Sequence, residues 1–184
     1  MKDKQSQIWG SHLKNLPDEQ NVLFCAGRDV QELPMADELL LPYDIWTNRA
    51  HCIMLERQGL VPKASLAKIL TGLSQLEELV ETGEFSLDPA KEDVHINVEA
   101  FVTEKQGADA GGRMHIGRSR NDQSACDMRL YLRSVGLNLF DSVKNLADSL
   151  LTQAAEHTES VMPGFTHYQP AMVTTWGHWL CAYV

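Results

Sequence analysis

The fold of this chain is decided by the stretch Met114-His115-Ile116-Gly117-Arg118-Ser119-Arg120-Asn121-Asp122-Gln123. It places two arginines, a serine and an asparagine directly before a long segment with helical apolar spacing. The first backbone N–H groups of a helix lack intrahelical partners, and the helix dipole favours negative charge there. The arginine fork matches a carboxylate, and Asn121 or Asp122 can cap the helix. The stretch therefore predicts an anion-binding site at a helix start or, more plainly, a solvated turn followed by an N-cap.

The segment after this stretch predicts one long helix, from Asn121 to about His157. It contains no proline, and its only glycine is Gly136. Apolar residues recur at spacings of three and four, with Ser142-Val143 filling the one gap of seven: Ala125, Met128, Leu132, Val135, Leu139, Leu146 and Leu150. This spacing is typical of the seam between packed helices. At 1.5 Å per residue the helix would be roughly 55 Å long, a length that indicates a large helical bundle.

The remaining segments also favour helices. Apolar spacing predicts helices at about 44–58, 62–81 and 89–107, each followed or ended by a glycine. Two prolines and a glycine predict a rigid loop over residues 162–170, and residues 173–184 are predicted to be helical. No segment favours a strand. The expected fold class is all-α, with an N-terminal helical domain at 1–112 and the beginning of a long-helix bundle, apparently truncated, at 113–184.

Composition excludes some classes of partner. The 184 residues carry a net charge of −9, which disfavours nucleic acid and acidic membranes as partners. Four cysteines are scattered without metal-ligand spacing, which indicates reduced cysteines of a cytoplasmic protein. No apolar run reaches the length of a membrane span, and the first residues do not form a signal peptide.

Few motifs for chemistry stand out. The seven histidines show no zinc-ligand spacing, so no metal is expected, and there is no glycine-rich phosphate loop. His167 lies between Thr166 and Gln169 in the proline-rich segment, where an oriented imidazole suits proton transfer. A loop histidine bonded to the backbone is the alternative.

Three ordered blocks, residues 92–99, 115–123 and 162–169, resemble the N-terminal part of argininosuccinate lyases, in the aspartase/fumarase superfamily. Residues 42–45, 50–51 and 176–180 are also similar to that family, so the resemblance covers about 37–184. The GRSRNDQ sequence at 117–123 is the most specific part, because fumarases and adenylosuccinate lyases have a different block there.

The resemblance implies a homotetramer built on a bundle of long helices, with active sites assembled from three subunits. It implies reversible β-elimination of argininosuccinate to arginine and fumarate, a step of arginine biosynthesis, without metal or organic cofactor. By resemblance the catalytic residue is His167, and the substrate-binding residues are Ser119, Arg120, Asn121, Thr166, Gln169 and His95. Donors at these positions suit the dianionic intermediate that forms when a proton leaves the carbon beside a carboxylate.

The chain departs from the family in two places. The family's loop with the catalytic serine lies beyond residue 184, so the chain by itself is expected to be an inactive fragment. The family's usual start after Trp9 is replaced by Gly10-Ser11-His12-Leu13. Three alternatives remain open: a lyase for another N-substituted aspartate, a non-catalytic crystallin-like member of the same fold, and a plain helical interaction module.

Overall fold

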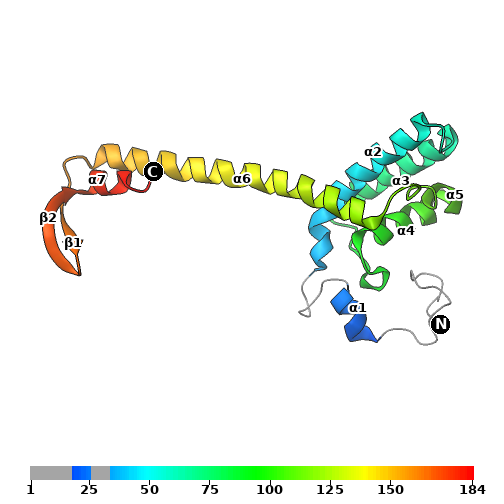
Figure 1. Ribbon diagram of the computed structural model, residues 1–184, viewed down its shortest axis with the longest axis horizontal. Helices are drawn as coiled ribbons and strands as arrows, with labels where there is room; N and C mark the ends of the chain where they lie inside the picture. Colours follow the sequence, from blue (N-terminus) through cyan, green and yellow to red (C-terminus); the bar gives the residue numbers. More distant parts are fainter. Residues whose placement is uncertain (1–17, 26–33) are drawn as a thin grey trace. The chain divides into compact units, whose positions relative to one another are not determined.

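The computed structural model describes residues 18–25 and 34–184, which form two compact units, Met1–Tyr131 and Leu132–Val184 (Figure 1). Each unit is described by itself below. The departure from the family at residues 10–13 lies outside the described residues. These units meet at residues 131/132 and are not the domains expected from the sequence. The expected domain boundary at 112/113 stays a prediction.

The first unit is helical. Its elements are α1 (Glu19–Cys25), η3 (Ala36–Leu40), α2 (Leu41–Arg57), α3 (Lys63–Glu81), η4 (Pro89–Lys91), α4 (Val94–Gln106), α5 (Ala108–Gly111) and the first turns of α6 (Arg120–Glu156). Local signals place the ends of these helices. Pro42 lies in the first turn of α2, where its missing N–H costs no bond, and Gly59 follows the helix with φ +71°. The Asp93 carboxylate accepts from the Ile96 N–H and caps α4.

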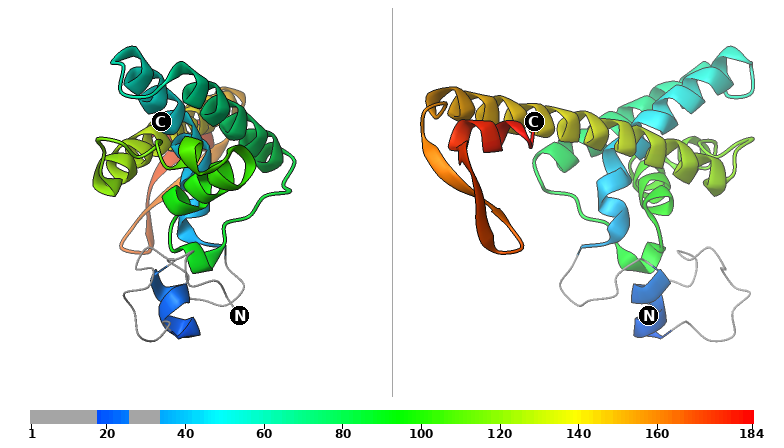
Figure 2. Two further views of the ribbon diagram at one scale, coloured as in Figure 1. Left: turned by 90° about the vertical axis from the view of Figure 1, so that its right-hand side faces the viewer. Right: turned by 60° about the vertical axis from the view of Figure 1, so that its left-hand side comes forward.

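Helices α2, α3 and α4 pack against one another and enclose the core (Figure 2). The residues with no exposed surface at its centre are Cys52, Ile69, Leu73, Leu76, Val94, Val98 and Val102. Apolar side chains at spacings of three and four on α3 and α4 face each other there. This packing fixes the starts of α2 and α4, which carry the polar residues of the site.

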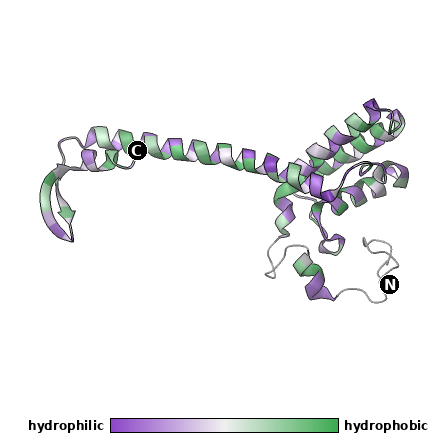
Figure 3. Cartoon of the chain, viewed as in Figure 1, coloured by the Kyte–Doolittle hydropathy of each residue, from purple (hydrophilic) through white to green (hydrophobic). Residues whose placement is uncertain are grey.

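Helix α6 confirms the predicted long helix. It has 37 residues and continues without a break through Gly136. In the second unit most of its seam is exposed, including Leu132, Leu139 and Leu146 with 56–62% of their surface accessible. Figure 3 shows hydrophobic and hydrophilic residues alternating in short segments along it.

The prediction of a rigid loop at 162–170 is wrong, because most of these residues form two strands. Residues 161–175 form a hairpin in which β1 (Val161–Thr166) pairs antiparallel with β2 (Gln169–Thr175). Both residues of the connecting turn, His167 and Tyr168, have positive φ, of 49° and 62°, as a type I′ turn requires. Each strand of a two-stranded ribbon has a free edge, so proline is compatible with the pairing.

The predicted helix over 173–184 is too long for the same reason. Residues 173–175 belong to β2, and α7 covers only Trp176–Cys181. The Thr175 hydroxyl caps α7 by accepting from the His178 N–H at 3.2 Å. The all-α fold class is nevertheless confirmed, because the hairpin is a small addition to a helical chain. Within the described ranges, no helix is long and apolar enough to cross a membrane.

Candidate functional site

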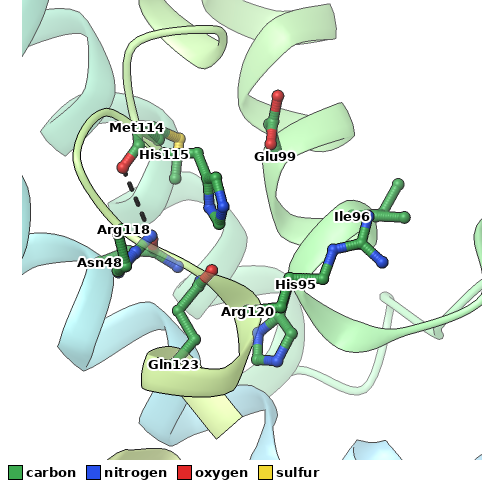
Figure 4. Close-up of a pocket in the computed structure, with 9 residues that line it drawn as sticks. All are labelled: Asn48, His95, Ile96, Glu99, Met114, His115, Arg118, Arg120 and Gln123. Atoms are coloured by element: carbon green, nitrogen blue, oxygen red, sulfur yellow. Dashed lines mark hydrogen bonds between the residues drawn. The ribbon is translucent and has the colours of Figure 1, made fainter. Parts of the chain in front are cut away.

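A pocket of about 100 Å³ lies in the first unit, where α2, α4, the loop before α6 and the start of α6 meet (Figure 4). Its lining is rich in cationic and imidazole groups. The lining residues are Asn48, His95, Ile96, Glu99, Met114, His115, Arg118, Arg120 and Gln123. Figure 4 shows the His115 ring and the Gln123 amide pointing toward one another. Met114, His115, Arg118, Arg120 and Gln123 of the stretch expected to bind an anion thus line this pocket, and anion binding stays a prediction.

Arg118 is partly buried in this pocket. One of its terminal nitrogens, Nη2, donates to the Asn48 side chain and, at 3.3 Å, to the Met114 carbonyl. Its buried Nε–H has no hydrogen-bond partner among the described residues. Burial lowers the pKa of Arg118, although nearby carboxylates such as Asp44 oppose this effect. An unpaired, partly desolvated guanidinium donor is what an incoming carboxylate would satisfy.

Arg120, also in the pocket lining, forms an ion pair with Asp93. Its Nη1 donates to Asp93 Oδ2 at 2.9 Å, and Asp93 Oδ1 caps α4. This bond ties the first residue of α6 to the start of α4. The remaining guanidinium donors stay available, since 37% of the side chain is accessible.

The helix start is capped differently from the expectation. Ser119 takes the cap position: its Oγ accepts from the Asn121 N–H at 3.2 Å, and its own N–H donates to Asp122 Oδ2 at 2.9 Å. Asp122 thus contributes to the cap by accepting from the Ser119 N–H, as the second residue of a capping box does. Asn121 is exposed.

Beneath the pocket lies a buried polar network centred on His95. Its Nδ1 lies 2.7 Å from Asp44 Oδ1, and its Nε2 lies 2.9 Å from Ser124 Oγ. Asp44 is fully buried and also accepts from the Asn48 and Gln123 amides at 2.8 and 3.1 Å. Burial opposes protonation of the imidazole, but the hydrogen bond and charge of Asp44 outweigh it and raise the pKa of His95.

Asp127 adds a second buried carboxyl to this network. Its Oδ1 accepts from the Thr47 hydroxyl at 2.6 Å, whereas Oδ2 lies 3.9 Å from His95 Nδ1 without a hydrogen-bond partner in the described part of the chain. Burial, reinforced by the charge of Asp44, raises the pKa of Asp127 to about 7. Burial also raises the pKa of Glu99 on the pocket wall, against the influence of His115.

Ligand atoms of Asp44, His95 and Asp127 lie within 4.8 Å of one another, the spacing that a metal site needs. Asp44 and His95 already use these atoms in hydrogen bonds. A neighbouring guanidinium, Arg118, balances part of the negative charge. Asp127 Oδ2 still has no hydrogen-bond partner in the part of the chain that the structure describes, and the expectation of no metal stays a prediction.

The structure distributes the predicted site residues over both units. His95 and Arg120 line one pocket, with Ser119 and Asn121 at the adjacent helix start. The other three residues lie in the hairpin of the second unit, where the register pairs Thr166 with Gln169 around His167.

Sequence reasoning missed Asp44, Ser124 and Asp127. A signal for two of them was present, because Arg120, Ser124 and Asp127 are spaced by four and three and share one face of α6. Asp44 has one local partner, Asn48, four residues along α2, but its other partners, His95 and Gln123, lie 51 and 79 residues away in the sequence.

Comparison with known proteins places this geometry in context. A family model described as "Lyase" matches residues 36–184. Argininosuccinate lyase of Trichlorobacter lovleyi is 40% identical over 180 residues, covering 98% of this chain and 38% of its own length. Argininosuccinate lyase of Ralstonia pickettii is 45% identical over 148 residues, covering 80% of this chain and 31% of its own. The chain thus spans well under half the length of these curated relatives.

Solved structures show the same architecture. EDDS lyase in complex with formate matches with a TM-score of 0.67 and 30% identity, covering 91% of this chain and 32% of that one. A fumarate lyase:delta crystallin from Brucella melitensis has a TM-score of 0.71 at 14% identity, covering 92% and 43%, and shows a similarity of fold alone.

Proposed function

Because this chain belongs to the lyase family whose model spans residues 36–184, we propose that it is part of a C–N lyase that converts argininosuccinate reversibly to arginine and fumarate. The curated relatives at 40–45% identity, which are named argininosuccinate lyases, support this substrate. The reaction is a β-elimination: a proton leaves the carbon beside a carboxylate, and the C–N bond then breaks.

The observation that carries the proposal is the cationic pocket. Arg118 offers an unpaired buried Nε–H, and Arg120 offers half-exposed guanidinium donors at the start of α6. His95 and His115 line the same pocket. Such donors stabilise a succinyl group most when the proton has left and negative charge accumulates on its carboxylate, which lowers the barrier.

The remaining roles follow from the resemblance. His167 transfers a proton to or from the substrate. It lies in the turn between β1 and β2. Ser119, Asn121, Thr166 and Gln169 contact the substrate. Replacing His167 with asparagine in an assembled enzyme would lower kcat by a factor of about 10² to 10⁴ and affect binding far less.

We further propose a cytoplasmic homotetramer. In the second unit α6 exposes a row of large apolar side chains, among them Leu137, Phe140 and Val143 with 57–67% of their surface accessible. Apolar rows of this kind are covered in a helical bundle by helices of other subunits.

A lyase for another N-substituted aspartate is the second candidate. The observation in its favour is the likeness to EDDS lyase at 30% identity over 91% of this chain. The succinyl-binding pocket would be the same in both cases, and the amine half of the substrate would differ. Fumarate release from argininosuccinate and from other N-succinyl amines, compared in the assembled enzyme, separates the two candidates.

The pocket is tested by titrating the chain with fumarate, argininosuccinate and arginine in a calorimeter. We expect fumarate and argininosuccinate, which both carry a four-carbon dicarboxylate unit, to bind and arginine to bind more weakly. Arg120→Gln should weaken fumarate binding by at least about tenfold, since a charge-assisted hydrogen bond contributes about 1.5–3 kcal/mol. Arg133→Gln, an exposed change further along α6, is the matched control. Equal affinities in all three proteins would refute the assignment of the pocket.

A further inference from the structure

The hydroxyl of Ser124 has an unusual partner for a serine in a helix. Three other hydroxyls on α6, those of Ser142, Ser149 and Thr152, donate to the backbone carbonyl four residues earlier at 2.8–2.9 Å. Ser124 instead pairs with His95 Nε2 at 2.9 Å, 29 residues away in the sequence. Ser124 as a whole is an exposed residue, and its bond to His95 is partly buried.

The imidazole is oriented by a buried acid. His95 Nδ1 lies 2.7 Å from Asp44 Oδ1, and Asp44 has no exposed surface. Amide groups of Asn48 and Gln123 donate to the same carboxylate and prevent it from rotating. This arrangement leaves Nε2 of a neutral His95 free of its proton and directed at the serine hydroxyl.

A positive charge lies on the same face of α6. Arg120 precedes Ser124 by four residues, which places the two side chains one above the other, and it lines the pocket with His95. An oxyanion that forms beside Ser124 would therefore have a guanidinium nearby.

Nucleophile, base and orienting acid at these distances are the arrangement that activates a serine. We propose that Ser124 is an activated nucleophile that attacks small carboxylic esters, with His95 as its general base and Asp44 as the residue that positions His95. The Ser124 oxygen forms a bond to the ester carbonyl carbon while its proton moves to His95 Nε2. The alcohol then leaves with that proton, and water hydrolyses the acyl-serine by the reverse transfers. This activity goes beyond the proposed elimination and does not depend on it.

The experiment uses a fluorophosphonate, which forms a stable Ser O–P bond and releases fluoride, in mildly alkaline buffer where the imidazole is neutral. The intact chain is treated and digested, and adducts are located by mass spectrometry. We expect Ser124 to react at least about 10²-fold faster than Ser142 and Ser149 in the same molecules, the contribution typical of a positioned general base. Because these serines lie on the same helix, they serve as internal controls for exposure and reagent quality.

Two variants and one control identify the cause of the reactivity. Ser124→Ala should abolish the fast adduct and the release of nitrophenol from 4-nitrophenyl acetate, whereas Ser142→Ala should leave both unchanged. His95→Gln, checked for folding by circular dichroism, should slow labelling of Ser124 to the rate of Ser142. Labelling of Ser124 no faster than that of the two control serines in the unmodified chain would overturn the proposal, whatever the variants do.

Discussion

Replacing Asp127 with asparagine probes the buried charge network most directly. The Asp127 side chain is fully buried, and its Oδ1 accepts from Thr47 at 2.6 Å while Oδ2 has no partner among the described residues. Burial, with the charge of Asp44 added, raises the pKa of Asp127 from 3.8 to about 7. Asparagine has nearly the same shape, keeps the carbonyl oxygen that accepts from Thr47, and carries no charge. The variant therefore removes the ionisation and little else.

The sign of the effect follows from a pKa that is raised on folding. The unfolded chain releases the Asp127 proton near pH 3.8 and the folded chain near pH 7, so the folded state binds the extra proton between these values. The stabilisation is fully present below the unfolded pKa and is lost progressively until the pH passes the folded pKa. Linkage gives a loss of about 2 kcal/mol between about pH 5.5 and about pH 8.5. Asp127→Asn lacks this loss, so its stability relative to the wild type should rise by about 2 kcal/mol over the same interval.

The assay uses Cys52, a residue of α2 with no exposed surface. A thiol reagent reaches it only when the first unit opens, so its alkylation rate, followed by mass spectrometry, reports the free energy of opening. Wild type and variant are compared at the same pH, which cancels the intrinsic pH dependence of the thiol. Asp141→Asn, an exposed change on the same helix, should follow the wild type at every pH. Parallel profiles for Asp127→Asn and the wild type would refute the raised pKa.

Three substitutions test the helices and packing inside each unit, two in the second unit and one in the first. Gly136→Ala should raise the unfolding free energy by about 0.5–1 kcal/mol, because nothing lies within 4 Å of the added Cβ on α6; a lower melting temperature by circular dichroism would contradict this. Gly177→Ala should lower it by about 1–3 kcal/mol in the same assay, because the Cβ would lie 2.4 Å from the Ala154 carbonyl oxygen, and an unchanged melt would show that α7 does not pack there. Leu73→Ala should cost about 2–5 kcal/mol by Cys52 alkylation, since Leu73 has no exposed surface; a cost below about 1 kcal/mol would count against the core described for α2, α3 and α4.

The candidate site was predictable only in part. The GRSRNDQ sequence predicted an anion site at Arg120 and its neighbours. Residues of the same helix start line the pocket. His95 was identified by resemblance alone. Its partner Asp44 could not be found from the sequence, because a buried ion pair between residues 51 positions apart leaves no local pattern.

The sequence by itself determined the helices. Each helix is held by hydrogen bonds between residues four apart, so apolar spacing, prolines at starts and glycines at ends specify it locally, as the uninterrupted α6 illustrates. Only the tertiary structure decided the hairpin at 161–175 and the polar network of Asp44, His95 and Asp127. A hairpin requires hydrogen bonds between two strands, and one strand with a proline resembles a loop when it is taken alone. The network exists because packing brings α2, α4 and α6 together and excludes water from three polar side chains, a condition that no single segment can impose.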